Sequence, residues 1–171
     1  MLLQTIALAG LVIRLDTTRE PTVTARRGET VVWSGIPRKW KPWKLASGDI
    51  DGNGMPDFAI GIVKQTHIYP RPHKTVFFYE VRGGKVVPKW KGSSLGRPLV
   101  DFQYANTARG PRLIALQTLL DGRLSLFIWR WNRFGFRLER SEGSWRTAKL
   151  LPPQDSQGLL VADGKPIRVK L

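Results

Sequence analysis

The stretch GDIDGNGMPDFAIG, residues 48–61, concentrates oxygen ligands in a chain that is otherwise strongly basic. Counted from Asp49, acidic or amide side chains recur at positions 1, 3, 5 and 9, and a backbone carbonyl stands at position 7. Alternating oxygen donors wrap a chain around Ca²⁺, and the intervening glycines permit the positive-φ turns that fold the donors inward. The pattern therefore predicts a calcium site between two strands. Its ligands are the side chains of Asp49, Asp51, Asn53 and Asp57 and the carbonyl of Met55.

An EF-hand and a magnesium site fit the loop less well than a calcium site between two strands. An EF-hand needs an acidic residue at position 12, which is Ile60 in this chain, and Mg²⁺ demands tighter octahedral geometry and keeps its waters. Without a cation, carboxylates about 5 Å apart repel by roughly 3 kcal/mol per pair at an effective dielectric of about 20. The alternative that stays open is a metal-free, Asx-rich turn, whose aspartates accept backbone N–H groups and pair with neighbours such as Lys44.

Tryptophans interleaved with Lys and Arg form a second kind of candidate site. They occur in PRKWKPWK (37–44), PKWKG (88–92) and WRWNRFGFR (129–137). An exposed surface of this kind could stack sugar rings or nucleobases while the cations hold acidic groups, whereas buried tryptophans would be core. The candidates for ligand contact are Trp40, Lys41 and Trp43, because they lie in a connection punctuated by prolines.

Signals of catalysis are absent from the sequence. It has no nucleophile elbow, no HExxH and no phosphate-binding glycine loop. His67 and His73 flank IYPRP in a long loop, where a solvated loop is favoured over a transition-metal site. We therefore expect a protein that is not an enzyme.

The charge balance favours acidic partners. The chain has 28 Lys and Arg against 13 Asp and Glu, a net charge of +15 at pH 7. Such a charge promotes association with nucleic acid, anionic glycans or lipid headgroups, although the cations are scattered. There is no cysteine, which excludes disulfides and thiolate metal sites. The apolar start, residues 1–15, is too short for a membrane span and lacks the basic leading segment of a signal peptide, so it is interpreted as a strand.

Short apolar runs separated by turn dipeptides such as Asp-Gly predict an all-β fold. An internal repeat is visible: ARRGETVVW (25–33) resembles EVRGGKVVPKW (80–90), and residues 45–64 align with residues 99–118. A period near 50–55 residues with four strands per unit predicts one β-propeller-like domain over residues 1–171, with about three to four four-stranded blades. The blades are 1–40 without its innermost strand, 43–95, 97–146, and 147–171 without its outermost strand. The ring would close by joining the terminal segments in one sheet or by homo-oligomerisation; a barrel or sandwich is the alternative.

Residues 49–61, DIDGNGMPDFAIG, resemble the FG-GAP repeat, also known as the VCBS repeat, of integrin α-subunit propellers and bacterial surface proteins. The family pattern is D-x-[DN]-x-[DN]-G-x-x-D followed by apolar residues and Gly, and this stretch satisfies all of it. The resemblance implies Ca²⁺ ligation by this loop. The aligned stretch DFQYANTARGPR carries arginines instead, so it is expected to bind no metal, and the single calcium ion is expected to be mainly structural.

The same resemblance implies a location at the cell envelope or outside the cell, and a role in adhesion or in binding glycan or protein ligands. Two other functions stay open. One is a basic protein that binds nucleic acid or another polyanion. The other is a self-assembling structural protein.

Overall fold

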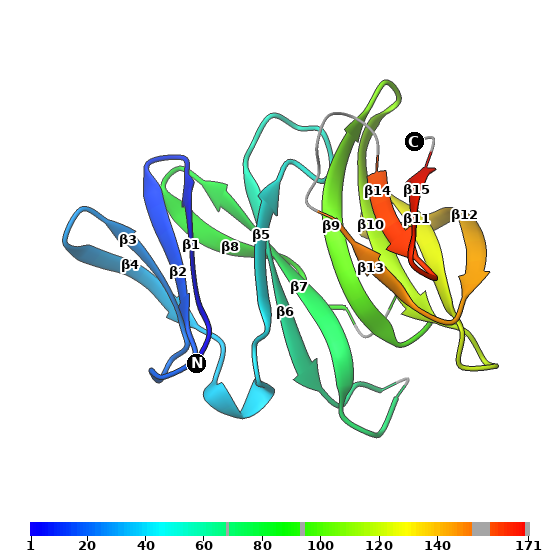
Figure 1. Cartoon of the computed structure of the whole chain (residues 1–171). Helices are drawn as coiled ribbons and strands as arrows, with labels where there is room; N and C mark the ends of the chain where they lie inside the picture. The colour runs from blue at the N-terminus through cyan, green and yellow to red at the C-terminus, as the bar shows by residue number, and fades with distance from the viewer. Residues whose placement is uncertain (68, 93–94, 152–157, 170–171) are drawn as a thin grey trace. The chain divides into compact units, whose positions relative to one another are not determined.

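The computed structural model describes residues 1–67, 69–92, 95–151 and 158–169. These residues form four antiparallel sheets of three or four strands, which confirms the all-β prediction, and none of the sheets closes into a ring (Figure 1). The β-propeller itself therefore stays a prediction. In the described part of the chain, no helix is long and apolar enough to cross a bilayer.

The strands follow one another as antiparallel neighbours in chain order. In the first two sheets they are β1 (Leu3–Leu8), β2 (Leu11–Asp16), β3 (Val23–Arg27), β4 (Thr30–Gly35), β5 (Lys44–Gly48), β6 (Asp57–Lys64), β7 (His73–Arg82) and β8 (Lys85–Trp90), with the short 3-10 helix η1 (Arg38–Trp40) between β4 and β5. In the last two they are β9 (Leu99–Thr107), β10 (Gly110–Thr118), β11 (Leu124–Asn132), β12 (Gly135–Trp145), β13 (Ala148–Leu150), β14 (Gly158–Ala162) and β15 (Lys165–Val169).

The chain divides into two compact units. The first comprises Met1–Asp49 and Asn53–Ser93, and the second comprises Ile50–Gly52 and Ser94–Leu171. The sheets β1–β4 and β5–β8 belong to the first unit, and the sheets β9–β12 and β13–β15 belong to the second. The single domain expected for residues 1–171 stays a prediction, and each unit is described by itself.

The first sheet differs from the expectation for residues 1–40. The sequence predicts a blade that lacks a strand, but this segment holds four strands, β1–β4. The apolar start is a hairpin rather than one strand: Leu8 pairs with Leu11, and the chain turns at Ala9 and Gly10 with φ of 49° and 74°. Alanine rarely adopts a positive φ, so Ala-Gly gives a weak turn signal.

One expected way to close the ring was to join the two terminal segments in one sheet. β1 and β15 belong to different sheets, so the described strands do not join the terminal segments in one sheet. The last sheet has three strands within the described residues, and residues 152–157 of the predicted blade 147–171 lie outside them.

In the first unit, the two sheets share one hydrophobic core, with β1 beside β5 and β4 beside β8. Burial alternates along β2, where Leu11, Ile13 and Leu15 face the core and the residues between them face outward. β6 is buried on both faces over most of its length, as its apolar sequence predicts. The second sheet supplies the aromatic part of this core, namely Phe58, Phe77 and Tyr79.

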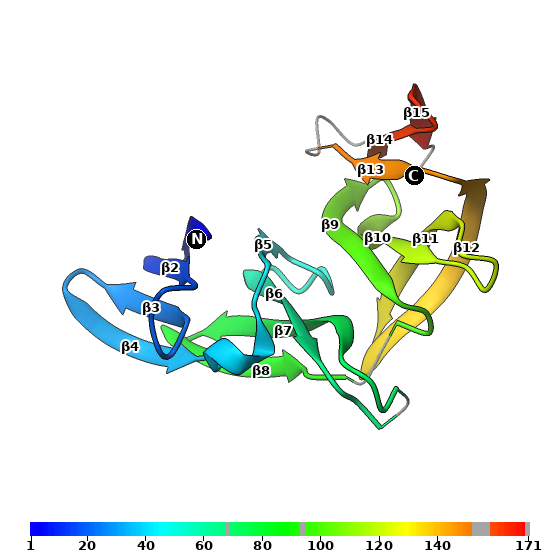
Figure 2. The same ribbon diagram turned by 60° about the horizontal axis from the view of Figure 1, so that its bottom comes forward.

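In the second unit, the sheet β13–β15 packs over β9 and β10 (Figure 2). The shared core contains Ile114, Leu116, Leu126 and Ile128 from one sheet and Leu150, Leu160, Ala162 and Val169 from the other. Among the buried polar side chains of this unit, Gln117 is fully buried, and its amide nitrogen donates to the carbonyls of Leu95 and Arg97 at 3.0 and 2.8 Å. This amide fixes the segment that leads into β9.

The first three sheets share an irregularity between their third and fourth strands. In each, the register shifts so that one residue of the outer strand has no partner directly opposite. These extra residues are Val32, Lys89 and Glu139. A β-bulge of this kind bends the strand and redirects the extra side chain, so the chain can use this position for chemistry without losing the sheet.

Tryptophan rings pack against glycines near the ends of the outer strands. A Cβ on any of these glycines would collide with the neighbouring indole, so glycine is what lets the ring approach. The pairs are Trp33 with Gly35, Trp90 with Gly92, Trp145 with Gly143 and, between the start of β5 and the next strand, Trp43 with Gly61. Much of the tryptophan content therefore serves packing.

Candidate metal centre and basic groove

The acidic loop joins β5 to β6, as the sequence predicts. Its base is closed by sheet pairing, since Gly48 lies opposite Asp57 and Asp57 lies opposite Glu80. One carboxylate oxygen from each of Asp49, Asp51 and Asp57 lies within 4.8 Å of the others. Within the described residues, these three aspartates form the group of acidic side chains that could hold a metal ion.

Backbone N–H groups organise the first half of the loop. The Asp49 carboxylate accepts hydrogen bonds from the N–H groups of Asn53 and Gly54 at 3.2 and 2.8 Å, and the Asn53 side-chain oxygen accepts from the Met55 N–H at 2.7 Å. Gly52 and Gly54 have φ of 72° and 79°, the positive values expected of them. These contacts are the ones that an Asx-rich turn makes, and they also hold the loop in its curled form.

Asp57 lies in a buried charge network that the sequence does not predict. The Nζ atom of Lys89 lies 2.9 and 3.1 Å from the two Asp57 oxygens and 2.9 Å from the Glu80 carboxylate. Asp57, Glu80 and Lys89 side chains are 0%, 2% and 8% exposed. Because β6 and β7 place the two carboxylates directly opposite each other, the shared ammonium offsets a repulsion that the sheet register imposes.

Glu80 is held in its ionised form. Burial raises the pKa of its carboxyl group, but hydrogen bonds from Lys89, Asn53 and Arg82 lower it more, to about 2. The Asn53 amide donates at 3.0 Å and the Arg82 Nε at 2.7 Å. The loop is therefore tied to β7 through a carboxylate that is charged at neutral pH.

The three aspartates fit a calcium ion, and the rest of the predicted ligand set fits less completely. Ca²⁺ takes oxygen ligands at about 2.3–2.6 Å, so two ligands on opposite sides of the ion lie about 5 Å apart, close to the 4.8 Å span here. Asn53 instead bonds Glu80 and Met55. A bound ion would hold Asp49, Asp51 and Asp57, and it would share Asp57 with Lys89.

The predicted ligand-contact residues lie in the first unit. Trp40 and Lys41 line a groove of about 420 Å³ together with Lys39, Val63, Lys64, Gln65 and Pro72. Trp40 is half-buried, lies edge-on to Phe77 with centroids 5.7 Å apart, and has the Lys64 ammonium 4.7 Å from its ring centroid. Trp40 therefore serves packing and lines the groove at the same time.

Trp43 is not one of the residues that line this groove. Its ring packs on Gly61, its indole N–H donates to the Ile62 carbonyl at 3.3 Å, and the Lys74 ammonium lies 4.5 Å from its centroid. Trp40 and Lys41 thus line one groove that Trp43 does not line, and ligand contact by these three residues stays a prediction.

Within the described residues, neither His67 nor His73 belongs to a group of three side chains that could hold a metal ion. His73 begins β7, and its ring lies 5.0 Å from that of Tyr69. The candidate-site residues that the sequence did not single out are Glu80 and Lys89. Glu80 carries a visible signal, a carboxylate inside the apolar run TVFFYEV, whereas the role of Lys89 depends on a bulge that composition does not reveal.

No protein-family model matches the chain, and neither a curated protein nor a solved structure matches it. The likeness to FG-GAP repeats therefore rests on residues 49–61 and stays a resemblance.

Proposed function

We propose that the chain is a non-enzymatic, calcium-stabilised module that binds an acidic glycan at the cell envelope or outside the cell. The observation that carries the calcium part is the convergence of three aspartate oxygens within 4.8 Å in the loop between β5 and β6. Crowded carboxylates of this kind favour a divalent cation. Extracellular calcium is abundant enough to fill a site of modest affinity.

The ion has a structural role in this proposal. The loop is closed at its base by the Gly48–Asp57 pair, and Asp57 also joins the buried network with Glu80 and Lys89. An ion bound to Asp49, Asp51 and Asp57 ties the tip of the loop to this buried base. Calcium is therefore expected to stabilise the sheet β5–β8.

The basic groove supports the glycan part. Lys39, Lys41 and Lys64 line the groove together with Trp40, so the groove combines an aromatic ring with three ammonium groups. Rings of this type pack against sugar faces, and ammonium groups pair with uronate or other acidic substituents. Because Lys64 lies over the Trp40 ring, a sugar that stacks on that face displaces the ammonium toward its own acidic group.

Calcium binding is tested by titration calorimetry and thermal unfolding in the presence of Ca²⁺ or chelator. Asp51→Asn is the informative variant because it leaves the Asp57–Lys89–Glu80 network intact. We expect it to weaken Ca²⁺ binding at least about tenfold and to remove most of the calcium-dependent rise in melting temperature. Asp121→Asn, in an exposed turn, is the matched control. Equal melting of the wild type with Ca²⁺ and with chelator would refute a filled structural site.

Glycan binding is tested with oligogalacturonate as the acidic probe and a neutral dextran oligosaccharide as its control. We expect Trp40→Ala and Lys41→Ala to weaken oligogalacturonate binding, while Lys85→Ala, an exposed lysine of the same unit, leaves it unchanged. Oligogalacturonate binding that neither groove variant affects would rule out the groove.

Nucleic-acid binding is the second candidate function, favoured by the net charge of +15 and by the same aromatic and basic groove. A single-stranded oligonucleotide distinguishes the two functions. Binding that falls steeply with salt and responds to many Lys and Arg variants alike would support the nucleic-acid function. Binding confined to the acidic glycan would support the first.

A further inference from the structure

The second unit holds a charge-inverted counterpart of the buried network around Asp57. In the first unit, Asp57 begins β6, Glu80 lies opposite it on β7, and Lys89 is the extra residue of the β7–β8 bulge. In the second unit, the matching bulge residue is Glu139, at the same nine-residue distance from Arg130 as Lys89 is from Glu80. The strand pairs around the two bulges correspond one for one.

Arg112 completes the correspondence. By strand register, Arg112 precedes Leu113 on β10 as Asp57 precedes Phe58 on β6, one residue beyond where the ungapped alignment of residues 45–64 with 99–118 would place it. The β10–β11 register pairs Leu113 with Trp129, and one step further along it places Arg112 opposite Arg130. Two carboxylates bridged by a lysine in one sheet thus become two arginines bridged by a glutamate in the other.

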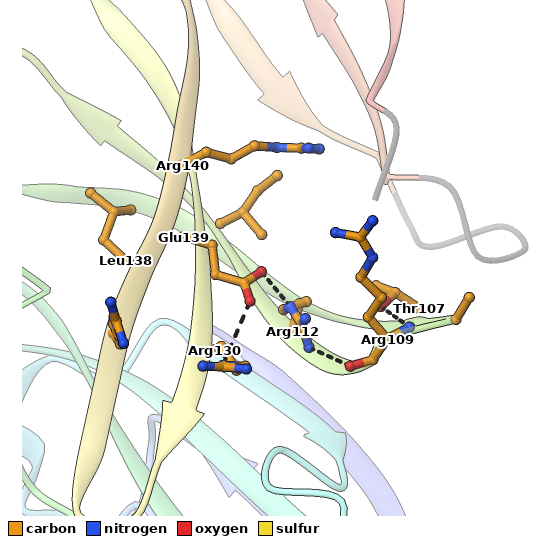
Figure 3. Close-up of a pocket in the computed structure, with 10 residues that line it drawn as sticks. Thr107, Arg109, Arg112, Arg130, Leu138, Glu139 and Arg140 are labelled. Carbon is orange, nitrogen blue, oxygen red and sulfur yellow. Dashed lines mark hydrogen bonds and ion pairs between the residues drawn. The ribbon is translucent and has the colours of Figure 1, made fainter.

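The inverted network forms one wall of a pocket of about 540 Å³ (Figure 3). Glu139 accepts from the Nε of Arg112 at 2.6 Å and lies 3.6 Å from the Nε of Arg130. The Arg112 side chain is 6% exposed. Its Nη1 atom donates to the carbonyls of Arg109, Gly110 and Pro111 at 3.1, 3.2 and 2.9 Å. Arg112 is thus a fixed, buried positive charge at the pocket.

The pocket holds more positive charge than its single carboxylate balances. Its lining contains five arginines and Glu139 as its acidic residue. Arg130 lies directly opposite Arg137 on β12, an arrangement of like charges that destabilises a sheet. Within the described residues, no carboxylate pairs with the guanidinium of Arg109 or of Arg137. A bound anion would relieve this repulsion.

We propose that this arginine pocket binds a tetrahedral oxyanion, the phosphate or sulfate group of a small ligand. Guanidinium forks match such groups bidentately, and about 540 Å³ suits a small molecule rather than a bare ion. Arg109, Arg130 and Arg137 provide the contacts, Arg112 provides the buried charge, and Glu139 is the resident anion that the ligand partly displaces. This site is independent of the calcium and glycan proposals, since it shares no residue with the acidic loop or with the groove around Trp40.

The first experiment measures binding of inorganic pyrophosphate to the full chain by titration calorimetry at low salt. Arg137→Ala removes an exposed guanidinium, and we expect it to weaken binding at least about tenfold. Arg123→Ala, an exposed arginine of the same unit outside the pocket, is the matched control and is expected to change the affinity less than about twofold. No pyrophosphate binding, or equal weakening by the two variants, would overturn the proposal.

Glu139→Gln provides the second test. The amide keeps an oxygen acceptor for Arg112 but removes the competing charge. We expect pyrophosphate to bind this variant more tightly than the wild type and to raise its melting temperature by more. A melting curve without ligand shows whether the variant is folded. Weaker binding by a folded variant would contradict the displacement of Glu139.

The source of the oxyanion is distinguished by three probes: inorganic pyrophosphate, a nucleoside monophosphate and a single-stranded DNA oligonucleotide. Arg137-dependent binding of the first two supports a small-molecule site. Binding of the oligonucleotide alone, weakened equally by Arg137→Ala and Arg123→Ala, would identify a diffuse basic surface and overturn the proposal.

Discussion

Replacing Lys89 by methionine tests the buried network most directly. Methionine retains much of the length and apolar volume of lysine but removes the ammonium that Asp57 and Glu80 share. At 2.9 Å and an effective dielectric of about 20, each ion pair is worth about 6 kcal/mol of attraction before desolvation is subtracted. Removing one partner of a buried pair costs about 3–5 kcal/mol in proteins. We therefore expect the free energy of unfolding in chelator to fall by about 4 kcal/mol.

The response of stability to calcium should then distinguish Lys89→Met from a variant that is destabilised for an unrelated reason. Without the Lys89 ammonium, Asp57 is available to the ion, so saturating Ca²⁺ is expected to restore more stability to Lys89→Met than it adds to the wild type. Urea unfolding followed by circular dichroism, with Ca²⁺ and with chelator, measures both quantities. Lys85→Met, an exposed position on the same strand, is the control and should change stability by less than about 0.5 kcal/mol. If the two variants are equally stable in chelator, the network does not stabilise the fold.

Three further predictions follow from buried groups. The Glu80 carboxyl has its pKa lowered from 4.5 to about 2, so its contribution to stability is complete above about pH 5 and is lost as the pH falls toward 2. The urea midpoint should therefore decline more steeply over that range for the wild type than for Glu80→Gln. Parallel declines would exclude this carboxyl as the cause of the acid destabilisation. Gly61→Ala places a methyl group where the Trp43 ring packs, and it should lower the free energy of unfolding by about 1–3 kcal/mol; an unchanged urea midpoint would show that the ring can move aside. Gln117→Leu leaves the Leu95 and Arg97 carbonyls before β9 without their donor, and it should destabilise the second unit by about 2–3 kcal/mol. Thermal unfolding of this variant, compared with that of Gln103→Leu, checks the prediction.

The sequence predicts the acidic loop well because its geometry is local. The side chains of Asp49, Asp51 and Asp57 are separated by a few residues and by glycines whose positive φ brings them together. The all-β class and the repeated sheets are also predictable, because alternation and turn dipeptides report local structure. The Ala9-Gly10 turn was missed since its dipeptide is a weak signal, and the first sheet was therefore assigned one strand too few.

The partners of the site could not be predicted because they depend on strand register. Lys89 on β8 reaches Asp57 on β6 across the intervening strand β7. The bulge between β7 and β8 decides that Lys89, rather than one of its neighbours, points at the carboxylates. The same holds for Glu139 and Arg112. The alternation of Arg and aromatic residues in WRWNRFGFR follows the two faces of a hairpin: Arg130 pairs with Arg137 on one face, and Trp131 pairs with Phe136 on the other.

The indoles fixed against glycines give individual sheets their own optical reporters. Trp90 lies in the first unit and Trp145 in the second, each held by a backbone position that excludes any larger residue. Variants that retain one of these tryptophans at a time, with the others replaced by phenylalanine, would therefore report the melting of one unit through its emission maximum. Coincident transitions would show that the two halves of the chain unfold cooperatively, and separate transitions would show that each half melts on its own.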